Sequence, residues 1–559
     1  MTALLGRSVM LVAALVTAAC SAPMARPTSD VERSRITLPP SPLTEEQRIA
    51  HVLNRLGYGP RPGDLARVKQ MGLAVYIDRQ LDPAGIPDDA ADRAAGWYPT
   101  LGMSSRELAH QYPLPDQQVL AKVRSGEMTP EEVARAIPPE RRPYRITAEV
   151  ASAKLARAVQ SERQLQEVMV DFWFNHFNVF ALKGGVRWTL PAYESEALRP
   201  YALGRFRDLL MATARHPAML FYLDNWMSTR AEFVVPAGPN KGRKMGLNEN
   251  YARELMELHT LGVDGGYTQR DVIEVARCFT GWSIDGPYRG GDFVFRPFAH
   301  DGGEKWVLGR PIRAGGGESD GRQVIDILAR HPATARFIAT KLARRFVSDD
   351  PPAPLVDRVA SSFLRSDGDI RAVLATIFSS PEFFAADAYR VKIKKPLELV
   401  ASAVRSLGGE IAPPAAPSGP VPGGGFGLAR RVASLGEPLY ESVPPTGHPD
   451  VAEAWVNSGA LIARMNFALA LAHNRIPGVR VELDRVLGGV DRRRPHEVLA
   501  RLVTAVLHDE MTHETRRVLA AQLGNPEITR VTPDDRAAGN TDVEKLLALV
   551  LGSPEFQRK

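Results

Sequence analysis

The segment that decides the fold is Asn248–Ile284, NENYARELMELHTLGVDGGYTQRDVIEVARCFTGWSI, which predicts two helices joined by a glycine turn. At about 100° per residue, the first helix has an apolar face, with His259 at its centre, and a polar face. Gly262 suits the left-handed position that ends a helix, and Thr268 with Asp271 forms a capping pair that starts the next one. We therefore expect His259 to be a buried core residue. The apolar face consists of Tyr251, Ala252, Leu255, Met256 and Leu258, and the polar face of Asn250, Arg253, Glu254 and Glu257.

The same helical periodicity recurs along most of the chain, and it predicts a mainly α fold. We expect a large multi-helix assembly in which residues 44–559 form a single domain, with a Pro/Gly-rich loop at 408–427. The only convincing strands are Asp292–Arg296 and Glu304–Gly309, which predict one small β-hairpin with His300 and Asp301 near its tip.

Composition bounds the class of protein. The chain has 559 residues, of which 44% are hydrophobic and 24% are charged, as in a soluble globular protein with a sizeable core. Its formal net charge is only +6, and the basic residues are mixed with acidic ones. Nucleic-acid binding usually requires a clustered basic patch, so we expect no nucleic-acid partner.

The N-terminus predicts export. Arg7 precedes an apolar run, Val9–Ala19, that is too short to span a bilayer, which is typical of a secretory signal peptide over residues 1–19. The run ends in VTAAC, which resembles a bacterial lipobox, so Cys20 is the expected lipidation site. Residues 20–43 then form a flexible tether to a membrane of the periplasm or outer cell envelope. Thr17 stands where Leu is common, which leaves cleavage nearby and a soluble secreted protein as the alternative.

The chain has one further cysteine, Cys278, so the mature protein can form no intrachain disulfide. Cys278 lies on the apolar stripe of the second helix of the opening segment and has no neighbours at metal-ligand spacing. We expect it to be a small buried hydrophobic residue.

A second informative stretch is Gln164–Asn178, QLQEVMVDFWFNHFN. Glu167 and Asp171 share one helical face with Asn175, whereas His176 points away from Glu167 on an unbroken helix. The two could meet at one site only if the helix ends or bends near Phe174. His176 is either a ligand or general base, or an imidazole that is hydrogen-bonded within an aromatic wall.

Two further groups carry candidate chemistry. Glu254 and Glu257, spaced i, i+3, could bind a metal ion with a histidine from another helix, or they could form a solvated face neutralised by Arg253 and Arg270. His300 and Asp301 supply two ligand types or an acid–base group, although Asp301-Gly302 is also an ordinary turn sequence.

The segment Gly317–Gly321, GESDG, matches the nucleophile-elbow pattern of serine hydrolases. That motif requires a strand directly before it, whereas here glycines precede it. We therefore reject a serine triad and expect Ser319 to cap a helix that starts at Arg322. Zinc-protease and phosphate-loop patterns are also absent.

Four segments resemble a large bacterial family that is known as domain of unknown function number 1800. They are QLQEVMVDFWFNHFNV, NENYARELMELHTLGVDGGYTQRDVIEVARCFTGW, HDGGEKWVLG and GHPDVAEAWVNSGALIARMNFA. The resemblance extends from about Thr44 to the end of the chain. It implies a mostly helical, exported protein whose partner is a neighbouring-gene product of another exported family, number 1501. It implies no catalytic residue.

Two hypotheses for the function remain. The first is a metal-dependent envelope enzyme that uses a divalent ion as a Lewis acid or to activate water or dioxygen. The second is a non-catalytic envelope protein that binds or scaffolds an exported partner. In the first, the metal ligands are Glu167, His176, Glu254, Glu257 and His300, and the catalytic residues are Glu254, His300 and Asp301.

Overall fold

The structure is a computed structural model that describes residues 36–559, except 116, 130–131, 134–136, 139–140, 237–240, 415–425, 526–527 and 529–540. The signal peptide, Cys20 and most of the tether lie outside the described residues. The predicted loop at 408–427 is described only at its two ends. In the described ranges, no helix has both the length and the apolar character needed to cross a bilayer.

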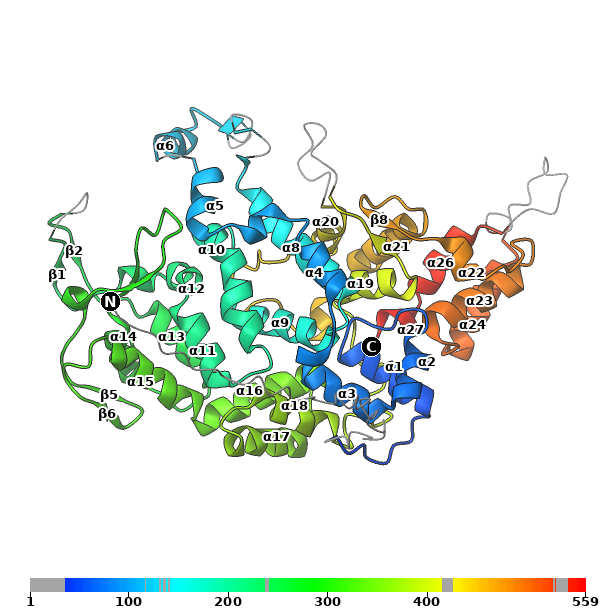
Figure 1. The fold of residues 1–559 in the computed structure, drawn as a ribbon, viewed down its shortest axis with the longest axis horizontal. Helices are drawn as coiled ribbons and strands as arrows, with labels where there is room; N and C mark the ends of the chain where they lie inside the picture. The colour runs from blue at the N-terminus through cyan, green and yellow to red at the C-terminus, as the bar shows by residue number, and fades with distance from the viewer. Residues whose placement is uncertain are drawn as a thin grey trace, which may run out of the picture.

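Helices form most of the described chain, which confirms the mainly α fold. Figure 1 shows an elongated body with α8 and α9 near its middle. The first third contains α1 (Glu45–Arg55), α2 (Asp64–Met71), α3 (Leu73–Leu81), α4 (Asp89–Ala95), α5 (Ser105–Gln111), α6 (Gln117–Ser125), α8 (Tyr144–Gln160), α9 (Gln164–His176) and α10 (Val186–Ala192). The middle contains α11 (Phe206–Arg215), α12 (Pro217–Tyr222), α13 (Asn250–Glu257), α14 (Gln269–Phe279), α15 (Glu318–Ala329), α16 (Pro332–Phe346), α17 (Ala353–Arg365) and α18 (Ile370–Phe378). The last third contains α19 (Pro396–Ser406), α20 (Gly427–Ser434), α21 (Ser458–Ala472), α22 (Leu483–Leu487), α23 (Pro495–Leu507), α24 (His513–Gln522), α26 (Val543–Leu551) and α27 (Pro554–Gln557).

The core is continuous along this body. One cluster of buried apolar side chains contains residues from Ile36 to Phe556, and a small second cluster surrounds Trp188. The single domain over residues 44–559 stays a prediction. The continuous core nevertheless provides a rigid frame for polar groups that are buried within it.

The opening segment folds as its sequence predicts. Thr268 and Asp271 form the capping box of α14, and Gly262 has a φ of +83° between the two helices. A Cβ at Gly262 would lie 3.0 Å from the ring of Phe337, so the close packing of the turn also favours a residue that has no side chain. His259 and Cys278 are buried, as expected.

The predicted hairpin is wrong in its pairing. Within the described residues, the strands form four two-stranded sheets, in which β3 (Trp282–Ile284) pairs with β4 (Phe293–Phe295) and β5 (Lys305–Val307) with β6 (Arg310–Ile312). The segment between β4 and β5 instead contacts the C-terminal end of α14, where the Asp301 N–H donates to the hydroxyl of Thr280, the C-cap residue, at 2.9 Å. Leu308 and Gly309 both have positive φ, which allows the tight turn between β5 and β6. The two remaining pairs are β1 (Phe233–Val234) with β2 (Lys244–Met245) and β7 (Glu410–Ile411) with β8 (Val479–Arg480).

One irregular helical segment positions the site. Pro191 lies inside α10, where it has no N–H to donate to the preceding turn. A π-helical turn, η4 (Tyr193–Leu198), follows directly. Such turns are rare and often occur at functional sites. Here the turn places Glu194 in the interior and Ser195 at the surface.

Candidate functional site

Glu167 is neutralised by a cation from another segment. Its carboxylate accepts two hydrogen bonds from Arg199, at 2.6 Å and 3.0 Å, and the side chain is buried. Burial opposes ionisation of this acid, but Arg199 outweighs it and holds the pKa of Glu167 below its usual value. Glu167 is therefore an ionised partner of Arg199.

His176, the last residue of α9, lies in the aromatic wall that was one of its two predicted settings. Its Nε2 donates to His259 O at 3.0 Å, and its Nδ1 accepts from Lys341 Nζ at 2.9 Å. Burial, followed by the charge of Lys341, holds the pKa of His176 well below its usual range. The ring is thus a neutral imidazole with both nitrogens engaged.

Glu254 and Glu257 lie on the half-buried face of α13. Glu257 accepts a hydrogen bond from the Tyr267 hydroxyl at 3.1 Å, and Arg253 pairs with Glu249 at 3.2 Å. Burial and the neighbouring Glu257 raise the pKa of Glu254. Within the described residues, Arg253 thus forms its ion pair with Glu249 and not with Glu254 or Glu257.

His300 and Asp301 are adjacent in sequence but have different partners. His300 is buried, with Nε2 3.2 Å from Asp320 Oδ2, and the same oxygen lies 2.6 Å from Lys305 Nζ. Asp301 instead forms an ion pair with Arg277 at 2.8 Å. Asp320 belongs to the segment GESDG, which was rejected as a nucleophile elbow. The expected helix start at Arg322, with Ser319 as its cap, is wrong, because α15 already begins at Glu318.

These contacts do not bring the predicted metal ligands into one group. Among residues that the structure describes, no three His, Cys, Asp or Glu side chains are placed to hold one metal ion. The physical reason is that cations or hydroxyls of other segments already engage most of these groups. The structure therefore does not bring Glu167, His176, Glu254, Glu257 and His300 together as one set of ligands, and metal binding by these residues stays a prediction. The catalytic role of Glu254, His300 and Asp301 stays a prediction.

A hollow of about 370 Å³ lies between α8 and the segments on either side of it, and we call it the α8 hollow. Its volume falls within the usual range for small-molecule sites. Much of the lining is apolar, and its charged residues are Arg157 of α8, Glu194 of η4 and Arg199, which directly follows η4. Its lining consists of Ala95, Gly96, Tyr98, Pro99, Leu101, Gly102, Val150, Ala153, Arg157, Pro191, Glu194, Ser195 and Arg199.

Two of these lining residues continue into the interior. Arg199, besides binding Glu167, lies 3.6 Å from Glu194 Oε1. Glu194 Oε2 lies 3.5 Å from Lys154 Nζ and accepts a hydrogen bond from the Tyr440 hydroxyl. Arg199 and Glu194 are therefore the outer end of a series of alternating charges that continues into the interior.

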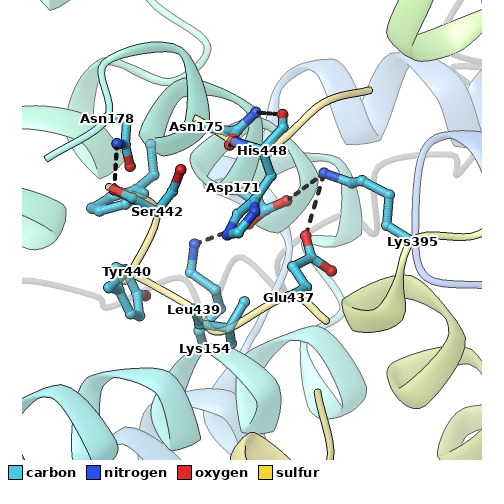
Figure 2. A pocket seen from close by; sticks show the side chains of 11 residues that line it. Lys154, Asp171, Asn175, Asn178, Lys395, Glu437, Leu439, Tyr440, Ser442 and His448 are labelled. Atoms are coloured by element: carbon cyan, nitrogen blue, oxygen red, sulfur yellow. Dashed lines mark hydrogen bonds and ion pairs between the residues drawn. The ribbon is translucent and has the colours of Figure 1, made fainter. Parts of the chain in front are cut away.

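The inner end is a second, smaller pocket, which Figure 2 shows and which we call the Asp171 pocket. Asp171 Oδ1 accepts from Lys154 Nζ at 3.1 Å, and its Oδ2 lies 3.7 Å from Lys395 Nζ. Lys395 is also 3.7 Å from Glu437, so in Figure 2 it bridges the two carboxylates. The pocket has room for about 20 Å³, roughly one water molecule. We call the whole series, Glu167, Arg199, Glu194, Lys154, Asp171, Lys395 and Glu437, the buried charge chain.

The loop that closes the Asp171 pocket is fixed to the end of α9. Asn175 donates to His448 O at 2.8 Å and accepts from the His448 N–H at 2.7 Å. Asn178 donates to Ser442 O at 3.0 Å and to Pro444 O at 2.9 Å, and Figure 2 shows the first of these bonds. The two asparagine side chains thus satisfy backbone N–H and C=O groups of the loop. They position the loop and are not part of the charge chain.

Glu437 provides a titration test of the charge chain. Burial raises its pKa to about 7, although Lys395 opposes this shift, and the Leu397 N–H donates to its carboxylate at 2.8 Å. In the unfolded chain the pKa of a glutamate is about 4.3. The raised pKa of Glu437 in the folded state therefore contributes stability that is fully present below about pH 4.3 and is lost as the pH rises through about 7. From pH 5 to pH 8, we expect the free energy of unfolding of the wild type to fall relative to Glu437→Gln by on the order of 2 kcal/mol.

Chemical unfolding across this pH range measures that difference. Glu497→Gln, at an exposed position of α23, is the control and should follow the wild-type curve. Parallel curves for the wild type and Glu437→Gln would show that Glu437 is ionised throughout.

Most of the charge chain could not be identified from the sequence. Glu167 and Asp171 were recognisable as one polar face of α9, but Glu194, Lys395 and Glu437 lie in unrelated segments without a shared pattern. Pro191 in a helical stretch was the only local signal for the irregular turn that carries Glu194.

Comparison with known proteins gives one match. A family model described as "Protein of unknown function (DUF1800)" matches residues 51–558. No curated protein and no solved structure matches the chain. Since the matched residues include the α8 hollow, the Asp171 pocket and nearly all the helices described above, the chain belongs to the DUF1800 family of proteins of unknown function.

Proposed function

We propose that this chain is an exported, lipid-anchored cell-envelope protein that binds a small organic anion in the α8 hollow. Export and anchoring rest on the sequence of residues 1–20, with Cys20 as the lipid attachment site. The exported partner that the family resemblance implies stays a prediction. The binding activity rests on the geometry of the hollow.

The observation that carries the proposal is the state of Arg157. Arg157 lines the hollow, and its one ion pair within the described ranges is to Asp92 at 3.5 Å, beyond the usual length of such a hydrogen bond. The Asp92 side chain is 66% exposed, so this pair is weak. Arg199, by contrast, is fully engaged with Glu167. Arg157 therefore has donors available for a carboxylate, phosphate or sulfate group.

The rest of the lining favours an anion that carries an apolar organic group. Tyr98, Leu101 and Val150 supply apolar surface, and Pro99 and Pro191 make the wall rigid. The volume of 370 Å³ equals that of roughly a dozen water molecules, far more than an inorganic ion needs. Expelling water from this apolar surface would add to the attraction of Arg157.

A second candidate function is acid–base catalysis on the bound anion. It is favoured by the position of Glu194, an acidic residue of the lining that lies on a π-helical turn. No metal ion is part of either candidate. Conversion of a bound anion that is lost in Glu194→Gln, while binding is kept, would distinguish an enzyme from a binding protein.

Calorimetric titration of the full chain with octanoate and with phenyl phosphate tests the binding proposal. We expect Arg157→Met to weaken binding by roughly 10- to 100-fold, because a charged hydrogen-bonding group is lost from the site. The control is Arg215→Met on α11, where the arginine pairs with Glu318 outside the hollow. Equal affinity in Arg157→Met, or no heat of binding for either anion at millimolar concentration, would contradict the proposal.

A further inference from the structure

A third pocket lies apart from the α8 hollow, where α19, α23 and α27 meet the turn after α1. We call it the Lys394 pocket. It has room for about 20 Å³, which is one water-sized sphere. The polar side chains used below that line it are Lys394, Ser402, Arg390, His508, Glu555 and Arg558.

Lys394 differs from the other buried lysines in its part of the chain. Lys392 pairs with Asp349 at 2.6 Å, and Lys395 lies 3.7 Å from Glu437. Lys394 is buried as deeply but, among the described residues, it has no carboxylate partner. Its Nζ donates to Ser402 Oγ at 2.8 Å and lies 4.0 Å from the centre of the Phe556 ring. A buried ammonium normally requires a compensating negative charge.

Two arginines add positive charge beside Lys394, and both are bound to neutral groups. Arg390 donates to Leu507 O at 3.2 Å and to Glu510 O at 3.0 Å. Arg464 donates to Gln557 Oε1 at 2.7 Å and to Lys394 O at 2.9 Å. Burial, followed by the charge of Arg390, lowers the pKa of Lys394 to about 7.

The remaining lining groups leave this excess positive charge in place. Arg558 is a further cation, and burial lowers the pKa of His508 to about 4, which makes His508 neutral at pH 7. Glu555 is the one acid of the lining, and its Oε1 accepts from Thr512 at 2.7 Å and 3.0 Å. Below its pKa of about 7, Lys394 is charged, and Arg390 and the exposed Arg558 line the same pocket. The single carboxylate of the lining is Glu555, whose Oε2 is buried and has no hydrogen-bond partner among the described residues.

We propose that the Lys394 pocket binds a single small inorganic anion of halide size, which is chloride under ordinary conditions. Lys394 Nζ would be its charged partner. Ser402 accepts from Lys394, so its own O–H remains available to donate to the anion. The volume of the pocket fits one ion and excludes an organic anion such as the α8 hollow would take.

Thermal unfolding of the full chain tests this proposal in sodium chloride, sodium bromide and sodium gluconate at equal ionic strength and at pH 6, below the pKa of Lys394. We expect both halides to raise the Tm by about 1–3 °C over gluconate, with saturation, because an ion that binds only the folded state stabilises it. Lys394→Met should remove the difference, and Lys183→Met, which affects a half-exposed pair with Asp224, should keep it. Equal Tm values in halide and gluconate would overturn the proposal.

Crystals of the wild-type chain soaked in bromide give a second test that does not depend on the folding of a variant. We expect an anomalous peak within contact distance of Lys394 Nζ and Ser402 Oγ. A water molecule at that position in crystals that bind bromide elsewhere would also overturn the proposal. Because the pocket is separate from Arg157, failure here leaves the organic-anion proposal unaffected.

Discussion

Asp171→Asn is expected to lower the free energy of unfolding by about 3 kcal/mol, because it removes the charge that faces two buried lysines. Asparagine keeps the shape of the side chain, so packing is unchanged and only the electrostatic partner is lost. Lys154 keeps Glu194 at 3.5 Å and Lys395 keeps Glu437 at 3.7 Å, which places the loss at the lower end for a broken buried pair. Chemical unfolding at pH 7 measures the change.

The matched control for Asp171→Asn is Asp208→Asn on α11. Asp208 is 44% exposed and pairs with Arg207 at the surface, so we expect a loss below about 0.5 kcal/mol. If Asp171→Asn costs no more than Asp208→Asn, the two lysines do not depend on Asp171 and the buried charge chain is not an electrostatic unit.

Arg199→Met is expected to cost about 3–5 kcal/mol at pH 7, since it leaves Glu167 ionised and unpaired in the interior. The pH dependence distinguishes this cause from a packing defect. Without Arg199, burial raises the pKa of Glu167, so a proton can remove the uncompensated charge as the pH falls. The difference in unfolding free energy between wild type and variant should therefore shrink between pH 7 and pH 5.

Arg207→Met provides the comparison for Arg199→Met, because Arg207 makes a similarly short ion pair, 2.7 Å to Asp326, at a more exposed position. We expect it to cost less than about 1 kcal/mol at either pH. A cost for Arg199→Met that equals this control, or that grows toward acid pH, would contradict the role of Arg199 as the partner of Glu167.

Local signals in the sequence predicted local structure well. The Thr268 capping pair, the glycine turn at Gly262 and the burial of His259 each depend on residues within one or two helical turns. The pairing of β4 and β5 depends instead on the contacts of the segment between these two strands. Asp301, in the segment after β4, donates its N–H to Thr280 at the end of α14, and this could not be inferred from the alternation of the strands.

The candidate site was less accessible to prediction, because its partners are distant in sequence. The polar face of α9 was recognised, and it proves to be the centre of the site: Glu167 binds Arg199, Asp171 binds two lysines, and Asn175 holds the loop at His448. Which cations would meet those acids required the tertiary structure. Among the described residues, the predicted metal ligands do not lie together as one set, since nearer partners engage most of them.

The most direct test of the central claim is a crystal structure of the full chain grown with phenyl phosphate. We expect density for the anion inside the α8 hollow, with its phosphate oxygens within hydrogen-bonding distance of the Arg157 guanidinium and its ring against Tyr98 and Leu101. An unoccupied hollow at saturating phenyl phosphate, or an anion bound with Arg157 turned toward Asp92, would contradict the account.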